Sequence, residues 1–172
     1  MRRPAAVVVV SLSCLGLLGG AGFALASPAE PAGPGWEVSI TSDDGELARL
    51  PLPGNSFSVS YRNSLYGTLA EERYAVAPDG TYVLEQLAAD QLAVLEEYYA
   101  VPSAPSRAAT SDRRDWTVEP DPARPASFER LSLAATDLGE RTLHVPGAPP
   151  LELWALVDDS NPFVVLHLEE TR

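Results

Sequence analysis

The chain has 172 residues and a formal net charge of −12, from 24 acidic and 12 basic side chains. Every basic residue is an arginine, so the absence of lysine excludes a Schiff-base mechanism and the lysine-containing P-loop. The acidic balance argues against nucleic acid as a partner, because such affinity comes largely from cations that displace counterions from phosphates. One cysteine and two histidines exclude thiolate-rich zinc, iron–sulfur and disulfide frameworks. We therefore expect no cofactor and no resident metal.

Residues 1–26 have the pattern of an export signal. Arg2 and Arg3 precede a charge-free apolar stretch, residues 5–26, which ends in Ala-Leu-Ala before Ser27. Cleavage there predicts a mature chain that begins at Ser27. The apolar stretch is also long enough to span a bilayer as a helix, so retention as an N-terminal membrane anchor stays open. In both cases we expect the remainder of the chain to be exported, either secreted or held at the cell surface.

Beyond the export segment, the composition predicts a tether followed by one domain. Residues 27–35 contain three prolines and two glycines and predict an extended tether. Residues 36–172 have a length that suits a single domain. Within them, residues 100–127 hold five prolines and a single aromatic residue, which predicts a long surface excursion. We expect the charged run at 112–115 on this excursion to be solvated and mutually compensating.

The domain has the pattern of short strands separated by turns. In residues 56–62, Phe57, Val59 and Tyr61 alternate with serines, which predicts a strand with one buried and one solvated face. The Asp-Gly pair at positions 79 and 80 favours a hairpin. The whole pattern predicts a mainly β fold, an antiparallel sandwich or small barrel of about eight to ten strands. The expected strands are 36–40, 46–52, 56–62, 69–76, 81–87, 116–119 (less regular), 128–134, 141–145, 151–157 and 163–169.

One short helix is expected at residues 91–99. Its residues are mostly good helix formers, and its apolar residues recur on one face. Asp90 is positioned to cap its first turn. Tyr98 and Tyr99 offer a platform for a ligand, but aromatic residues at helical spacing more often belong to a core, and we expect them there.

The sequence shows little catalytic equipment. His144 and His167 are expected as ordinary surface residues, and no G-x-S-x-G nucleophile elbow occurs. A hydrolase that uses Glu72 or a histidine is the least favoured alternative. The acidic runs at 43–46 and 158–161 lack the ligand spacing of a calcium loop, so we expect turns there and no cation site. We expect the protein not to be an enzyme.

The most unusual segment spans residues 61–74. It places hydrogen-bonding side chains at the end of one strand, and it places Glu72 and Tyr74 two residues apart on the same face of the next. One interpretation is a hairpin with a polar connection that is held by its own side-chain hydrogen bonds. The other is a binding site for a small ligand, a cation or a partner, with the candidate residues Arg62, Asn63, Ser64, Tyr66, Glu72 and Tyr74.

This segment resembles the signature of a small exported family of unknown function, whose members are often encoded beside TRAP-type solute transporters of the TAXI class. The family carries His-Ser-Val at the end of one strand and Glu-x-Phe at the start of the next. Here Asn63-Ser64-Leu65 and Glu72-Arg73-Tyr74 occupy these places, so Ser64 and Glu72 match while Asn63 replaces the histidine. Any family role that needs an imidazole at that position is therefore not possible here. The resemblance covers residues 36–170.

Two functions follow as expectations. The resemblance implies a non-enzymatic accessory or regulatory partner of a membrane solute transporter of the TRAP/TAXI type. The alternative is an extracytoplasmic module that binds a small ligand or cation at Asn63, Ser64 and Glu72.

Overall fold

The computed structural model of the protein describes residues 35–171, which belong to one compact unit. The predicted export segment, residues 1–26, and nearly all of the tether lie outside the described residues. Among the residues described, no helix is both long and apolar enough to cross a membrane.

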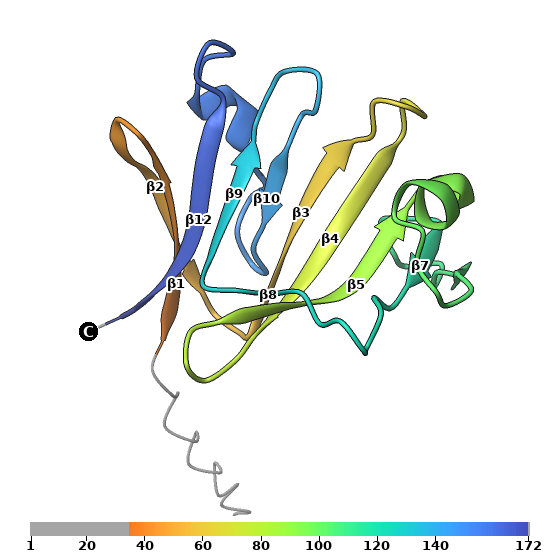
Figure 1. Cartoon of the computed structure of the whole chain (residues 1–172). Coiled ribbons are helices and arrows are strands. Elements are labelled where there is room, and N and C mark those ends of the chain that lie inside the picture. The colour runs from red at the N-terminus through yellow and green to blue at the C-terminus, as the bar shows by residue number, and fades with distance from the viewer. Residues whose placement is uncertain (1–34, 172) are drawn as a thin grey trace, which may run out of the picture. The chain divides into compact units, whose positions relative to one another are not determined.

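Four strands form the smaller of two antiparallel sheets (Figure 1). The first and last strands of the domain, β1 and β12, lie side by side at its centre, with Val38 paired to Leu168. Their outer neighbours are β2 and β9, so the order is β2-β1-β12-β9. The bounds are β1 Trp36–Ser42, β2 Gly45–Leu52, β9 Arg130–Ala134 and β12 Phe163–Glu170.

The larger sheet has eight strands, in the order β11-β10-β3-β4-β5-β7-β6, with β8 paired to β5. Its centre is the antiparallel meander β3-β4-β5. The predicted hairpin between β4 and β5 is present, and Gly80 in its turn adopts a φ of 82°. The bounds are β3 Ser56–Arg62, β4 Leu69–Val76, β5 Tyr82–Ala89, β6 Ser106–Arg107, β7 Trp116–Val118, β8 Ser127–Phe128, β10 Thr142–His144 and β11 Leu151–Glu152.

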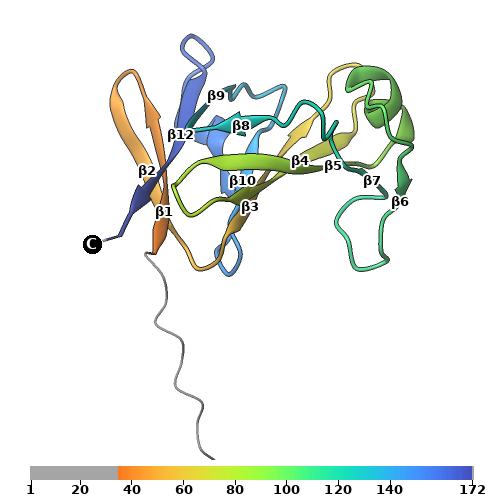
Figure 2. The ribbon, with the colours of Figure 1, turned by 60° about the horizontal axis from the view of Figure 1, so that its bottom comes forward.

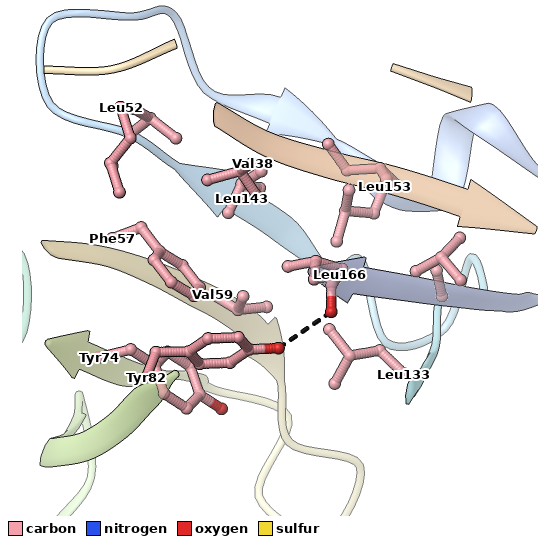
Figure 3. Packing of buried hydrophobic residues seen from close by; sticks show 14 of the residues in the cluster. Val38, Leu52, Phe57, Val59, Tyr74, Tyr82, Leu133, Leu143, Leu153 and Leu166 are labelled. Atoms are coloured by element: carbon pink, nitrogen blue, oxygen red, sulfur yellow. Dashed lines mark hydrogen bonds between the residues drawn. The ribbon is translucent and has the colours of Figure 1, made fainter. Parts of the chain in front are cut away.

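The two sheets pack face to face around one apolar core (Figure 3). Val38 and Leu166 from the smaller sheet meet Phe57 and Val59 from the larger one. The sheets remain separate and open at their edges. Of the two predicted architectures, a sandwich or a small barrel, the chain therefore forms the sandwich. Burial of each such side chain contributes about 1.5–3 kcal/mol. The Tyr82 hydroxyl also donates a hydrogen bond of 2.9 Å to the Leu166 carbonyl and so links the two sheets.

The strand at 56–62 differs from the prediction on one face. Phe57, Val59 and Tyr61 point into the core as expected. However, Ser58 and Ser60 on the opposite face are buried as well. The reason is tertiary: side chains of other segments cover this outer face of the larger sheet, including Arg113 and His144. The strand is therefore apolar on one face and enclosed by polar groups on the other.

The predicted helix is present but short and wide. Leu92 and Ala93 begin it, and Val94–Tyr98 (η1) is a π-helical turn in which the Tyr99 amide donates to the Val94 carbonyl at 3.2 Å. Val94 and Leu95 fill a second apolar cluster under η1. Asp90 does not cap this helix, because its carboxylate binds Arg114 instead.

Three further details differ from the sequence expectations. The described residues contain twelve strands, because short pieces such as β6 and β8 also pair. The predicted strand 151–157 consists of only two paired residues, followed by a 3-10 turn at Leu153–Leu156 (η2) that buries Leu153 in the core. The predicted strand 128–134 divides into β8 and β9, which join different sheets.

We predict that Tyr82→Phe lowers the free energy of unfolding by about 1–2 kcal/mol. The substitution removes the buried hydrogen bond between the sheets and changes the side-chain volume little. Chemical denaturation monitored by tryptophan fluorescence measures the change. Tyr98→Phe is the matched control, since the Tyr98 ring is 54% exposed and its hydroxyl makes no side-chain hydrogen bond among the described residues. Equal effects of the two substitutions would contradict the assignment.

Candidate functional site

A fully buried carboxylate lies at the centre of the outer face of the larger sheet. Glu71 on β4 is 0% exposed and stands opposite Ser60 of β3. Its Oε1 accepts hydrogen bonds from Arg73 at 3.1 Å and from Arg113 at 2.5 Å. Arg114 Nε lies 3.5 Å from Oε2. An isolated buried charge is very costly, so these guanidinium groups are what allow an ionised carboxylate at this position.

The arginines control the protonation state of Glu71. Burial by itself raises the pKa of this carboxyl. Hydrogen bonds from Arg113, Ser58 and Arg73, together with the positive charge of Arg73, outweigh burial and hold the pKa below its ordinary value. Glu71 is therefore ionised at neutral pH, a buried negative charge surrounded by partly exposed arginines.

Arg73 fastens the excursion at 100–127 to the sheet. Its Nη1 and Nη2 donate to the two carboxylate oxygens of Asp112 at 2.8 and 2.6 Å, and Nη1 also donates to Gln86 at 2.7 Å. This two-pronged geometry is the strongest form of arginine–carboxylate pair. It lowers the pKa of Asp112 to about 2.

The charged run at 112–115 is thus not simply solvated, and that prediction is wrong. Arg113 reaches Glu71 and Ser58, and Arg114 is largely buried between Glu71 and Asp90. The partners of these charges lie on strands far away in sequence. In Figure 2 the loop between β6 and β7, which carries this run, lies at the lower right beside β5 and β7.

The prediction that His144 is an ordinary surface residue is also wrong. His144, at the end of β10, is half-buried and belongs to the same face. Its Nε2 lies 2.8 Å from the Ser60 hydroxyl. Burial, aided by the charge of Arg113, lowers the pKa of the imidazole below 6.5. The histidine is therefore neutral at neutral pH, with one ring nitrogen engaged by Ser60.

This face contains a groove with a volume of about 820 Å³, and its floor is formed by Ser58, Glu71, Arg73 and His144. One side of the groove is the turn between β10 and β11, which supplies apolar side chains and prolines. The other side includes Arg113 from the excursion and Glu119 after β7. The lining residues are Ser56, Phe57, Ser58, Glu71, Arg73, Tyr74, Glu85, Gln86, Arg113, Glu119, His144, Val145, Pro146, Gly147, Ala148 and Pro150.

The candidate residues of the 61–74 segment fall into separate environments. Asn63 is 2% exposed, and its Oδ1 accepts the backbone amides of Leu65 and Tyr66 at 3.0 and 3.2 Å. It therefore shapes the connection between β3 and β4, as the hairpin interpretation describes. Ser64 is exposed. Glu72 is paired with Val59, four positions before Asn63, so the hairpin separates Glu72 from this connection.

Two further candidates pair with residues on other segments. Arg62 is exposed and donates to Glu140 at 2.9 and 2.6 Å. The Tyr66 hydroxyl donates to Glu97 of η1 at 2.6 Å, and this bond raises the pKa of Tyr66. Both contacts are intramolecular and lie outside the groove.

Glu72 and Tyr74 do share a face, as predicted, and it is the inner face of the sheet. The Tyr74 hydroxyl donates a 2.7 Å hydrogen bond to Glu72 Oε2, and the Tyr99 hydroxyl donates one of the same length to Oε1. The Tyr61 hydroxyl lies 2.7 Å from that of Tyr99, and burial raises the pKa of Tyr61 to about 12. This network binds η1 to β3 and β4. Tyr99 is thus partly core, as expected, whereas the Tyr98 ring is exposed.

The remaining predicted positions lie away from the groove. His167 is on the outer face of the smaller sheet and only 17% exposed, so it is not an ordinary surface residue. Its Nε2 lies 3.0 Å from Glu169, whose own pKa His167 and Arg49 lower. The runs at 43–46 and 158–161 contain turns, as predicted. Among the described residues, no group of three or more acidic, histidine or cysteine side chains is arranged to hold a metal ion.

Of the six predicted candidates, Tyr74 is among the groove-lining residues, and sequence reasoning missed the other residues that build the groove. Glu71 and Arg73 are two apart on β4, and their face is that of Ser58 and Ser60 once β3 and β4 pair. This alternation of polar residues on neighbouring strands was a usable signal. No comparable signal marked Arg113.

The chain matches no known protein-family model, and comparison with curated proteins and with solved structures finds no match either.

We predict that the Asp112–Arg73 pair makes part of the stability acid-sensitive. The pKa of Asp112 falls from 3.8 to about 2 on folding, so the ionised form stabilises the folded state above pH 4. That contribution is lost as the pH falls toward 2. Urea denaturation across this range should show a shallower loss in Asp112→Asn than in the wild type. Asp43→Asn, in an exposed turn, should retain the wild-type slope; identical slopes in all three proteins would contradict the pair's role.

We also predict that His144 titrates below pH 6.5 and that Arg113→Gln raises its midpoint, because the arginine charge disfavours the imidazolium. NMR titration of the imidazole protons measures both values, and His144→Gln assigns the signals. Circular dichroism is used first to check that the Arg113→Gln protein folds, and the comparison is made only if it does. A wild-type midpoint above 6.5 would rule out the buried, arginine-flanked environment.

Proposed function

We propose that this protein is an exported, non-enzymatic binding domain that holds a small molecule in the groove on the outer face of the larger sheet. The construction of the groove carries this proposal. Its volume of about 820 Å³ suits a small-molecule site, and its floor contains the buried carboxylate of Glu71 fastened by arginines. Side chains held by several partners are preorganised, which reduces the ordering cost of binding.

The Ser60–His144 contact supports binding more than catalysis. In a serine hydrolase, a third group orients the second imidazole nitrogen, and the serine faces the substrate. Within residues 35–171, no side chain makes a hydrogen bond to His144 Nδ1, and Ser60 is buried and outside the groove lining. Ser60 acts instead as a positioning residue that orients the imidazole, which leaves Nδ1 available to a ligand.

Export through residues 1–26 and partnership with a TRAP/TAXI-type transporter remain predictions within this proposal. They are supported by the signal-like sequence and by the resemblance at 63–65 and 72–74. A groove for a small solute suits an accessory protein that works beside a solute transporter. The proposed binding site is the groove, in place of the earlier alternative centred on Asn63, Ser64 and Glu72.

We predict that a groove ligand found by thermal-shift screening changes the NMR signals of His144 and leaves those of His167 unchanged. The two histidines provide an internal control, because His144 lines the groove and His167 lies on the outer face of the other sheet. At 100 times its dissociation constant, such a ligand should add about 2.7 kcal/mol to the free energy of unfolding.

A blocking variant tests the location independently. Ser56→Trp places a large ring at an exposed position of the groove lining and should abolish the thermal shift. Ser132→Trp makes the same change at an exposed position of β9 and should retain it. If every ligand tolerates Ser56→Trp, or if all ligands perturb His167 alone, the groove is not the binding site.

A further inference from the structure

The chemistry of the groove walls points to a class of ligand, an inference that rests on the proposed function. We infer that the groove takes a short peptide with free termini, whose carboxylate binds Arg113 and whose ammonium group binds Glu85 and Glu119. Three features carry this inference: an incompletely used guanidinium, two carboxylates that form no ion pair within residues 35–171, and a stiff apolar turn.

The guanidinium of Arg113 has donors to spare. Only its Nη2 makes hydrogen bonds within the described residues, to Glu71 and Ser58. The side chain is 51% exposed although it is anchored at one end. Nε and Nη1 thus remain available to an incoming acceptor. By contrast, all three guanidinium nitrogens of Arg73 donate hydrogen bonds, to Glu71, Gln86 and Asp112. Arg73 therefore belongs to the fixed floor of the groove.

Two carboxylates supply the opposite charge. Glu85 is the extra residue of a β-bulge in β5, which turns it into the groove lining. Glu119 follows Val118, which pairs with Leu87, so it lies at the level of Gln86 and next to Glu85. Both glutamates are exposed, and within residues 35–171 neither forms an ion pair. They are therefore available to a ligand cation.

The third wall is apolar and stiff. The turn between β10 and β11 contributes Val145, Pro146, Ala148 and Pro150 to the lining. Prolines fix their backbone φ angles, so this wall loses little conformational freedom on binding. It offers contact to apolar side chains, while the buried polar floor offers Gln86 and His144 to peptide amides.

A short peptide satisfies all three features at once. Neither a simple anion nor a simple amine does, because an anion leaves the glutamates without a partner and an amine leaves Arg113 without one. A purely anionic ligand also faces the repulsion of the two glutamates and of a chain with a net charge of −12. Charge-assisted hydrogen bonds at both termini then provide specificity, and the proline-rich wall provides contact area.

Isothermal titration calorimetry on the folded domain tests this inference with the tripeptide Ala-Leu-Ala. The probe is compared with its C-terminal amide and its N-acetylated form. We expect measurable binding of the free tripeptide and a loss of at least about tenfold in affinity for each blocked form. These comparisons use the wild-type protein, so they do not depend on the folding of any variant.

Two variants assign the peptide termini to the two kinds of charged side chain. Arg113→Lys keeps a charge for Glu71 but loses the two-pronged guanidinium, so it should weaken binding of the free peptide and not of the amide. Glu119→Gln should weaken binding of the free peptide and not of the acetylated form. Arg124→Gln, outside the groove lining and highly exposed, should bind all three peptides as the wild type does.

The outcomes separate this inference from the proposed function. Equal affinity for free and blocked peptides overturns the charge assignment. So does an absence of peptide binding when a screened ligand is sensitive to Ser56→Trp, and the groove then remains a binding site for another class of molecule. If neither peptides nor any screened ligand respond to Ser56→Trp, the proposed function fails, and the peptide inference fails with it.

Discussion

The buried charge of Glu71 is the constraint on which the outer face of this protein depends. A carboxylate with no exposure to water must be compensated, and in a chain without lysine only arginine offers a permanent positive charge. Arg73 comes from the same strand, whereas Arg113 and Arg114 come from the excursion. Compensation therefore fixes the loop against the sheet. It adds to the pairing of β7 with β5 and to the packing of Trp116 and Val118, which hold the later part of the excursion.

The hairpin of β3 and β4 gives the domain two chemically different faces. On the inner face, Phe57 and Tyr74 join the apolar core, and Glu72 accepts two tyrosine hydroxyls beside it. On the outer face, Ser58 and Glu71 belong to the charged network. A shift of one residue in either strand would exchange these sets and bury charge in the core. The alternation thus specifies the register and the location of the groove together.

The sequence expectations succeeded where hydrogen-bond partners are close in the chain. The self-contained connection around Asn63 and the shared face of Glu72 and Tyr74 involve residues two or three positions apart. The expectation failed for the charged run at 112–115. Its two acids and two arginines are neighbours in the chain, so we expected them to compensate one another in solvent. Its actual partners, Glu71 and Arg73, lie about 40 positions earlier. The composition of a short segment does not predict ion pairs with residues so far away in the chain.

The sequence by itself determined the β-rich architecture, the positions of most strands along the chain and the acidic charge, because alternation, turn residues and charge act over a few positions. Only the tertiary structure decided that the serine face of β3 is enclosed, that Glu71 is buried among arginines and that His144 is half-buried. The physical reason is that the groove is assembled from β3–β5, the excursion and the β10–β11 turn. Their side chains acquire a shared environment only when the sheet brings them together.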